Sequence, residues 1–136
     1  MMLAYVDSSV WIARFEGLLP YRQKIDNQLM QFAEQGFSFC VSDVVLLEVL
    51  IKPIQVSNTK AIETYRHVFR QTQLVPIYEK VFVDALDIAK KEGLKSMDAI
   101  HVALALQNQC KYFISTDSHF KNLKSLPTVW INLTSN

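Results

Sequence analysis

Four acidic residues occupy positions where a carboxylate is more than a simple surface charge. Asp7 directly follows the apolar run LAYV, and Asp117 comes two positions after the apolar run YFIS. Glu48 lies within VVLLEVLI, whose apolar residues would cover most of a helix, and Asp98 lies in the first turn of the apolar segment SMDAIHVALA. A carboxylate that leaves water without a partner costs free energy, so each position suggests a bound partner.

Carboxylates gathered in one place would repel one another and raise one another's pKa values unless a cation neutralised them. Oxygen ligands favour Mg²⁺ or Mn²⁺ over zinc, and such a cation can activate water and stabilise the charge that develops during phosphodiester cleavage. Other catalytic patterns are absent from the sequence. The histidines His67, His101 and His119 lack the H-E-x-x-H spacing of a zinc site, and there is no G-x-x-x-x-G-K-[ST] or G-x-S-x-G motif.

Each acid also has a purely structural explanation. Asp7 and Asp117 suit a helix cap and a turn, and Asp98 would interact favourably with the dipole of its helix. Glu48 could belong to a narrow polar stripe on its helix. His101, three residues after Asp98, could face a shared site but is more typical of a helical histidine with its own internal partners. The local sequence leaves the structural and the chemical explanations open.

The elements that would position these acids alternate between short apolar runs and longer helical stretches. Strands are expected at residues 3–6, 37–41, 74–77, 112–115 and 128–131. Helices are expected at 9–35 with a break near Gly17 and Pro20, from Ser42 or Asp43 to just before Pro53, from 57 or 58 to about 72, at 80–92, and from a cap at Ser96 to about 109. This alternation predicts an α/β fold with a parallel sheet of about five strands, flanked by helices on both faces. The carboxyl ends of such strands share one edge, which could gather all four acids.

The composition suits one folded domain over residues 1–136. Half of the residues are apolar and 20% are charged, which argues against disorder. The formal charge of +1 excludes a strongly basic chain that coats phosphate backbones non-specifically. We expect a cytoplasmic protein with no membrane contact, because the first residues lack a secretory signal and no apolar run approaches the ~18 residues that span a bilayer. Cys40 and Cys110, which form no C-x-x-C motif, are expected to be buried reduced thiols.

Four segments closely resemble the motifs of the PIN-domain family, and within it the VapC-type toxin ribonucleases of prokaryotic type II toxin–antitoxin systems. They are YVDSSVWI with Asp7, VSDVVLLEVL with Glu48, SMDAIHVALA with Asp98 and YFISTDSHF with Asp117, in this order from residue 5 to residue 120. The resemblance implies a single PIN-like domain and an endoribonuclease that uses Mg²⁺ or Mn²⁺ to hydrolyse RNA phosphodiester bonds. It also implies a homodimer that a cognate antitoxin protein holds inactive.

The resemblance also assigns roles to individual residues. Asp7 and Asp98 correspond to the most direct metal ligands, and Asp117 could act through a water molecule. Thr116 resembles the family's small hydroxyl residue that orients an acid or a water molecule. Some relatives have a further acid where this chain has His119, which leaves a fifth carboxylate and a second metal position open. The acidic quartet, expected to serve both catalysis and metal binding, is Asp7, Glu48, Asp98 and Asp117.

Three basic residues near the motifs could guide RNA to the quartet, although each is more typical of an ordinary solvated charge: Arg14, Lys95 and Lys121. One alternative function is a non-catalytic PIN-like scaffold that binds RNA or an antitoxin, but a scaffold has no reason to keep a cation site. Another is an aspartyl-phosphate enzyme, but the D-x-D loop of the phosphatases would require an acid where Ser9 stands. The sequence does not distinguish transfer, ribosomal and messenger RNA as substrates.

Overall fold

The structure of the chain, a computed structural model, describes residues 1–134, so the last two residues of the expected 1–136 domain lie outside it. Its strands are β1 (Met2–Val6), β2 (Phe37–Val41), β3 (Gln73–Leu74), β4 (Tyr112–Ser115) and β5 (Thr128–Trp130). Its helices are α1 (Ser8–Glu16), α2 (Leu19–Glu34), α3 (Asp43–Gln55), α4 (Thr59–Phe69), α5 (Val81–Glu92) and α6 (Ser96–Gln107), with a 3-10 turn η1 (Ser118–Phe120). The strands form one sheet in the order β3-β2-β1-β4-β5, and each neighbouring pair is parallel. The predicted α/β fold with a five-stranded parallel sheet is confirmed.

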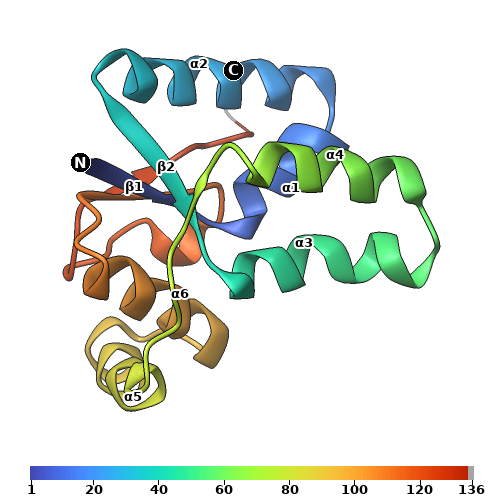
Figure 1. Ribbon diagram of the computed structural model, residues 1–136. Coiled ribbons are helices and arrows are strands. Elements are labelled where there is room, and N and C mark those ends of the chain that lie inside the picture. Colours follow the sequence, from blue (N-terminus) through green and yellow to red (C-terminus); the bar gives the residue numbers. More distant parts are fainter. Residues whose placement is uncertain (135–136) are drawn as a thin grey trace.

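Helices cover both faces of this sheet. In Figure 1, α2 lies on one side of the strands, and α5 and α6 lie on the other. The central strand β1 is sealed between these layers, because Ala4, Tyr5 and Val6 have no exposed surface. Burial on both faces explains why its sequence is a continuous apolar run without polar alternation.

The carboxyl ends of β1 and β4 meet at one edge of the sheet. Val6 pairs with Ile114, and the backbone N–H of Asp7 donates to the Ile114 carbonyl at 3.1 Å. The sequence order of the strands also reverses between β1 and β4, since β2 and β3 lie on one side and β4 and β5 on the other. In open α/β sheets, such a reversal is where a crevice for ligands opens. Asp7 and Ser115 therefore lie at this point of reversal, one just beyond β1 and the other at the end of β4.

One predicted helix end was wrong, because α3 continues through Pro53 to Gln55. Pro53 is buried on the same face of the helix as Val45 and Val49, which lie at successive spacings of four residues. Apolar contact on this face offsets the hydrogen bond that proline cannot donate. The expected strand at 74–77 was also misplaced. It spans Gln73–Leu74, and it stops short of Pro76, which has no N–H to offer a neighbouring strand.

Two predicted helix caps differ from the structure. Ser42 stands at the N-cap of α3, but its side chain makes no capping hydrogen bond and instead contacts the Tyr5 hydroxyl at 2.8 Å. Ser96 is the first residue of α6, and Lys95 takes the N-cap position. Two other caps follow expectation more closely, since Asp7 caps α1 and Asn58 caps α4 through their side chains.

The two cysteines are buried and free, as predicted. Although they are far apart in sequence, the fold brings the sulfur atoms of Cys40 and Cys110 to 3.3 Å from each other. The hydrogen bond with the Cys110 sulfur, together with burial, raises the pKa of the Cys40 thiol well above its usual range. Cys40 is therefore an inert thiol that packs as a small apolar side chain.

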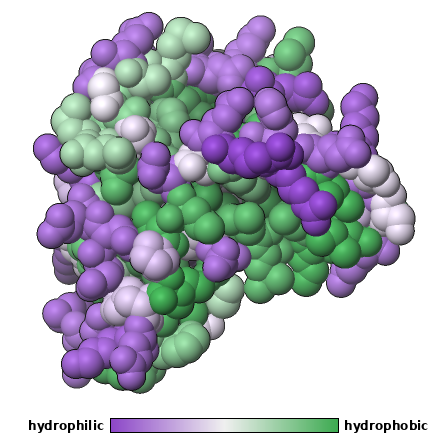
Figure 2. Space-filling view, in the orientation of Figure 1, coloured by the Kyte–Doolittle hydropathy of each residue, from purple (hydrophilic) through white to green (hydrophobic). Residues whose placement is uncertain are grey.

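Two helices carry apolar side chains on their exposed surfaces. On α3 these are Leu47, Ile51 and Ile54, and Figure 2 shows hydrophobic surface spread over this helix. On α5 they are Phe82, Val83 and Leu86, each more than half exposed. Within the described residues, every helix is too short or too polar to cross a lipid bilayer.

Candidate active site

Asp7 lies just beyond the end of β1 and is 3% exposed. One carboxylate oxygen, Oδ1, accepts hydrogen bonds from the Ser9 N–H at 3.1 Å and the Ser9 hydroxyl at 2.6 Å. The other, Oδ2, accepts from the Ser115 hydroxyl at 2.7 Å. Burial nevertheless raises the pKa of Asp7 from 3.8 to about 6, because these neutral donors offset only part of the lost hydration. Asp7 is both a helix cap and a buried carboxylate that a cation would stabilise.

Asp98 and Asp117 lie on either side of His119. The Nδ1 atom of His119 is 3.4 Å from Asp98 Oδ2 and 3.4 Å from Asp117 Oδ1. Partial burial and the negative charge of Asp117 raise the pKa of Asp98 above its ordinary value. The carboxylates of Asp98 and Asp117 therefore repel each other, and a divalent cation bound beside them would relieve this repulsion.

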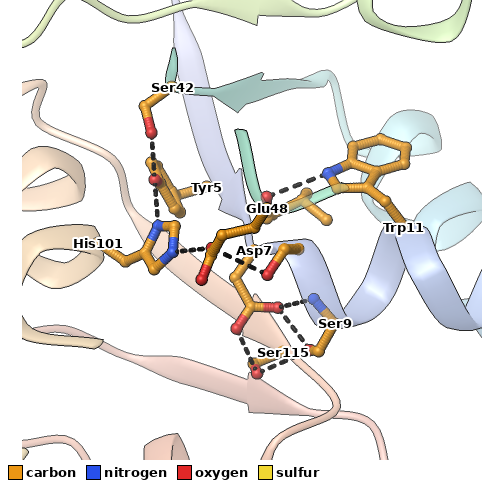
Figure 3. A network of polar contacts seen from close by, with 10 residues as sticks. Tyr5, Asp7, Ser9, Trp11, Ser42, Glu48, His101 and Ser115 are labelled. Carbon is orange, nitrogen blue, oxygen red and sulfur yellow. Dashed lines mark hydrogen bonds and ion pairs between the residues drawn. The ribbon is translucent and has the colours of Figure 1, made fainter. Parts of the chain in front are cut away.

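Glu48 projects from α3 into a second group of polar side chains. Its Oε1 atom accepts from the Ser8 hydroxyl at 3.0 Å and lies 2.5 Å from Nε2 of His101. Burial would raise the pKa of Glu48, but the hydrogen bonds from His101 and Ser8 hold it below its ordinary value. Figure 3 shows Glu48 between His101 and the Asp7 segment. The carboxylate is thus fixed in place and ionised.

Ser115 joins the groups around Asp7 and Asp117. Its hydroxyl donates to Asp7 Oδ2 and accepts from the Asp117 N–H at 2.9 Å. The carboxylate of Asp117 also accepts from the His119 N–H, so Asp117 caps η1 while it faces Asp98 through His119. The capping and chemical explanations for Asp117 therefore hold together.

The acidic quartet does not form one tight ligand set. Within residues 1–134, the ligand atoms that lie within 4.8 Å of one another belong to Asp98, Asp117 and His119. Asp7 and Glu48 are outside this set, and their hydrogen-bonded groups adjoin it through Ser115 and His101. The two carboxylates of this set provide the hard oxygen donors that Mg²⁺ and Mn²⁺ bind, and the imidazole adds one nitrogen donor. The donor chemistry fits a divalent cation.

Two hydroxyl groups other than that of Thr116 contact the buried acid. They belong to Ser9 and Ser115, while Thr116 contributes its backbone N–H to Ser9 Oγ at 3.1 Å. The Ser8 hydroxyl donates to Glu48. Ser115 was not among the predicted site residues. The available signal was the serine that ends the apolar run YFIS, and in the structure it has no exposed surface.

His101 is the site residue whose position the sequence did not decide. It is 2% exposed, and it has hydrogen-bond partners on both ring nitrogens, which matches the expectation of a histidine with internal partners. One of these partners is Glu48, so the same contacts make it part of the site. The spacing Asp98-x-x-His101 on a helix places both residues on one face, and this was the available signal.

The basic residues differ in their access to the acids. Lys95 lines a small depression of about 130 Å³ together with Gly93, Leu94, Asp98 and His119. Arg14 is instead paired with Asp26 at 2.5 Å. Lys121 lies over the ring of Trp130, 4.6 Å from its centroid. Of these three residues, Lys95 is therefore the one placed to meet a phosphate that approaches the depression.

Comparison with known proteins identifies one family model, described as the PIN domain, which matches residues 4–126. No curated protein sequence matches the chain significantly. Among solved structures, the chain superposes on VapBC-1 from nontypeable Haemophilus influenzae with a TM-score of 0.75 and 14% identity, over 98% of this chain and 100% of that one. VapBC2 from Rickettsia felis, bound to a DNA fragment from its promoter, superposes with a TM-score of 0.72 and 12% identity, over 94% of this chain and 98% of that one. VapC20 from Mycobacterium tuberculosis, a sarcin-ricin loop cleaving toxin, superposes with a TM-score of 0.68 and 13% identity, over 87% of this chain and 92% of that one.

Proposed function

The chain belongs to the PIN-domain family, and from this membership we propose that it is a metal-dependent endoribonuclease that hydrolyses RNA phosphodiester bonds. The observation that carries the proposal is the meeting of Asp98, Asp117 and His119 beside the buried carboxylate of Asp7. These groups concentrate negative charge at the sheet edge where α/β folds bind ligands. The domain is proposed to extend over residues 1–136.

Asp98, Asp117 and His119 would hold the cation, Mg²⁺ or Mn²⁺, with Asp7 and Glu48 completing the acidic surroundings. When bound, the cation activates water and stabilises the charge that develops on the phosphate. Asp7 and Glu48 are held by fixed donors, so their carboxylates need little reorganisation when the cation and substrate arrive. The role of Thr116 would be to anchor Ser9, because its backbone N–H donates to the Ser9 hydroxyl. The Ser9 hydroxyl in turn donates to Asp7.

The chain's own residues also suggest how a phosphate reaches the acids. Lys95 stands at the rim of the depression that contains Asp98 and His119. Its ammonium would attract an RNA phosphate and offset part of the repulsion from the carboxylates. The chain is nearly neutral but has a lysine at the rim of the depression. This charge distribution suits recognition of a particular RNA shape rather than tight binding of any strand.

We further propose that the protein is the toxin of a toxin–antitoxin pair, which an antitoxin protein restrains, and that it forms a homodimer. The solved VapBC assemblies with the same fold support this proposal. The exposed apolar side chains of α3 and α5 supply surface that protein partners would bury. A PIN-like scaffold without turnover is the competing function, and activity measurements separate the two.

The test is RNA cleavage by the purified protein with Mg²⁺ or Mn²⁺, compared with Asp98→Asn and Asp7→Asn. Asp87→Asn is the matched control, because Asp87 is a surface acid paired with Lys91 on α5. We expect cleavage by the wild type and the control, loss of cleavage in both site variants, and no turnover in excess EDTA or with Ca²⁺ alone. Equal activity in all four proteins, or full activity in EDTA, would refute the nuclease proposal.

A further inference from the structure

A chain of hydrogen bonds runs from Ser42 through the protein interior to Glu48. The Ser42 hydroxyl is 2.8 Å from the Tyr5 hydroxyl, which is 2.7 Å from Nδ1 of His101. Nε2 of His101 is 2.5 Å from Oε1 of Glu48. Ser42 and Tyr5 have no exposed surface, and His101 is 2% exposed. Figure 3 shows the four side chains as one continuous series that links the ends of β1 and β2 to α3 and α6.

The hydrogen at the Glu48 end of this series follows from what each group can donate. An ionised carboxylate only accepts, so the nitrogen of His101 that faces Glu48 must carry a hydrogen. Nδ1 of His101 faces the Tyr5 hydroxyl, and the Tyr5 hydroxyl faces the Ser42 hydroxyl. Each hydroxyl can donate or accept, so every group in the series is satisfied and His101 donates to Glu48 whichever way the two hydroxyls point.

We propose that Tyr5 and Ser42 are positioning residues that fix the orientation of the His101 ring, so that its Nε2–H holds Glu48 toward the cation site. This inference rests on the proposed function in one respect, the participation of Glu48 in cation binding. Partners that orient a ligating group from behind keep its geometry ready for the metal. In this chain, a residue of the central strand and a residue at the start of α3 serve that purpose.

Packing explains part of the network but not the polar contact of Tyr5. The Tyr5 ring stacks on Phe113 at 5.3 Å between centroids, so a phenylalanine at position 5 would retain the apolar contacts. The Tyr5 hydroxyl is needed only if it orients the His101 ring through Nδ1. Tyr5→Phe therefore removes the proposed function of Tyr5 and leaves its role in the core.

The direct test is nitrogen NMR of the protein labelled at histidine, recorded at neutral pH without metal. The His101 signals are identified by their loss in His101→Gln. We expect a protonated Nε2, and we expect the Nδ1 resonance to move in Tyr5→Phe because Nδ1 loses its hydrogen-bond partner. An unprotonated Nε2, or an unchanged Nδ1 resonance in Tyr5→Phe, would overturn the proposal.

The second test is Mn²⁺ affinity measured by calorimetry, which does not depend on RNA cleavage. His101→Leu removes the donor to Glu48 and should weaken binding about 10–100-fold, and His101→Gln, which keeps an N–H donor, should recover most of it. Tyr112→Phe is the control, since Tyr112 packs against Phe32 and Phe37 at the far end of β4. Wild-type affinity in a folded His101→Leu protein, or equal weakening in the leucine and glutamine variants, would contradict the role of His101. If the wild type bound no Mn²⁺, the proposed cation-dependent function would fail, and the NMR result would still decide whether Tyr5 orients His101.

Discussion

The hydroxyl of Ser115 donates to the buried carboxylate of Asp7 at 2.7 Å, and so ties the end of β4 to the end of β1. The same hydroxyl accepts from the Asp117 N–H at 2.9 Å. One buried serine thus fixes the positions of two acids of the quartet that are 110 residues apart in sequence. Strand pairing sets the distance between the backbones, and this hydroxyl sets the orientation of the side chains.

Replacing Ser115 by alanine should therefore impair both folding and function. The variant leaves Asp7 Oδ2 and the Asp117 N–H without this partner in a buried setting, which costs about 1–3 kcal/mol of unfolding free energy. We expect RNA cleavage to fall about 10–100-fold, because the supporting contacts of a metal site are lost. Urea unfolding and cleavage assays on Ser115→Ala and Thr116→Val measure both effects. A larger loss of activity in Thr116→Val than in Ser115→Ala would return the orienting role to Thr116.

Asp7→Asn should make the apo protein more stable at neutral pH while it removes activity. Burial raises the pKa of Asp7 from 3.8 to about 6, so the folded state binds a proton that the unfolded state releases between these values. The stability that the protonated group provides is fully present below about pH 4 and is lost as the pH rises through about 6. Each pKa unit corresponds to 1.36 kcal/mol, so asparagine should gain up to about 3 kcal/mol above pH 7 and almost nothing near pH 4.

Chemical denaturation of the wild type and Asp7→Asn from acid to neutral pH, in EDTA, measures this difference. Asp87→Asn serves as the control because its carboxylate is a solvent-exposed partner of Lys91. If the free energies of unfolding of Asp7→Asn and wild type differed by a constant amount across the pH range, burial would not destabilise the Asp7 carboxylate.

His119 should raise the affinity of the site for Mn²⁺ relative to its affinity for Mg²⁺. Its Nδ1 is 3.4 Å from an oxygen of Asp98 and from an oxygen of Asp117, and its side chain is 57% exposed and free to turn toward a cation. An imidazole nitrogen is a better ligand for Mn²⁺ than for Mg²⁺, which prefers oxygen donors. His119→Asp should therefore raise Mg²⁺ affinity relative to Mn²⁺ by several-fold, as measured by calorimetry. His67→Asp, at an exposed position on α4, should leave the ratio unchanged, and an equal change in both variants would exclude a ligand role for His119.

The sequence predicted the parts of this site that depend on strand order and missed those that depend on side-chain direction. Apolar runs separated by helices were sufficient to predict a parallel sheet and to bring Asp7 and Asp117 to one edge. The partners of Ser42 and His101 depend on rotamers and on contacts between distant elements, and neither leaves a periodic signal in the sequence. Pro53 was misread for a similar reason, since its burial against the core outweighs its local preference to end a helix.

Asp98→Asn should uncouple cation binding from stability. In the apo protein, Asp117 and partial burial raise the pKa of Asp98, so two repelling carboxylates lower the stability of the folded state. A cation that binds only the folded protein adds about 2.7 kcal/mol when its concentration is 100 times its Kd. The wild type should therefore melt at a higher temperature in Mn²⁺ than in EDTA, by several degrees.

Asp98→Asn should gain stability in EDTA, since the repulsion is gone, and should gain little more from Mn²⁺. Asp87→Asn should respond to Mn²⁺ as the wild type does, so a full Mn²⁺ response in Asp98→Asn would remove Asp98 from the ligand set.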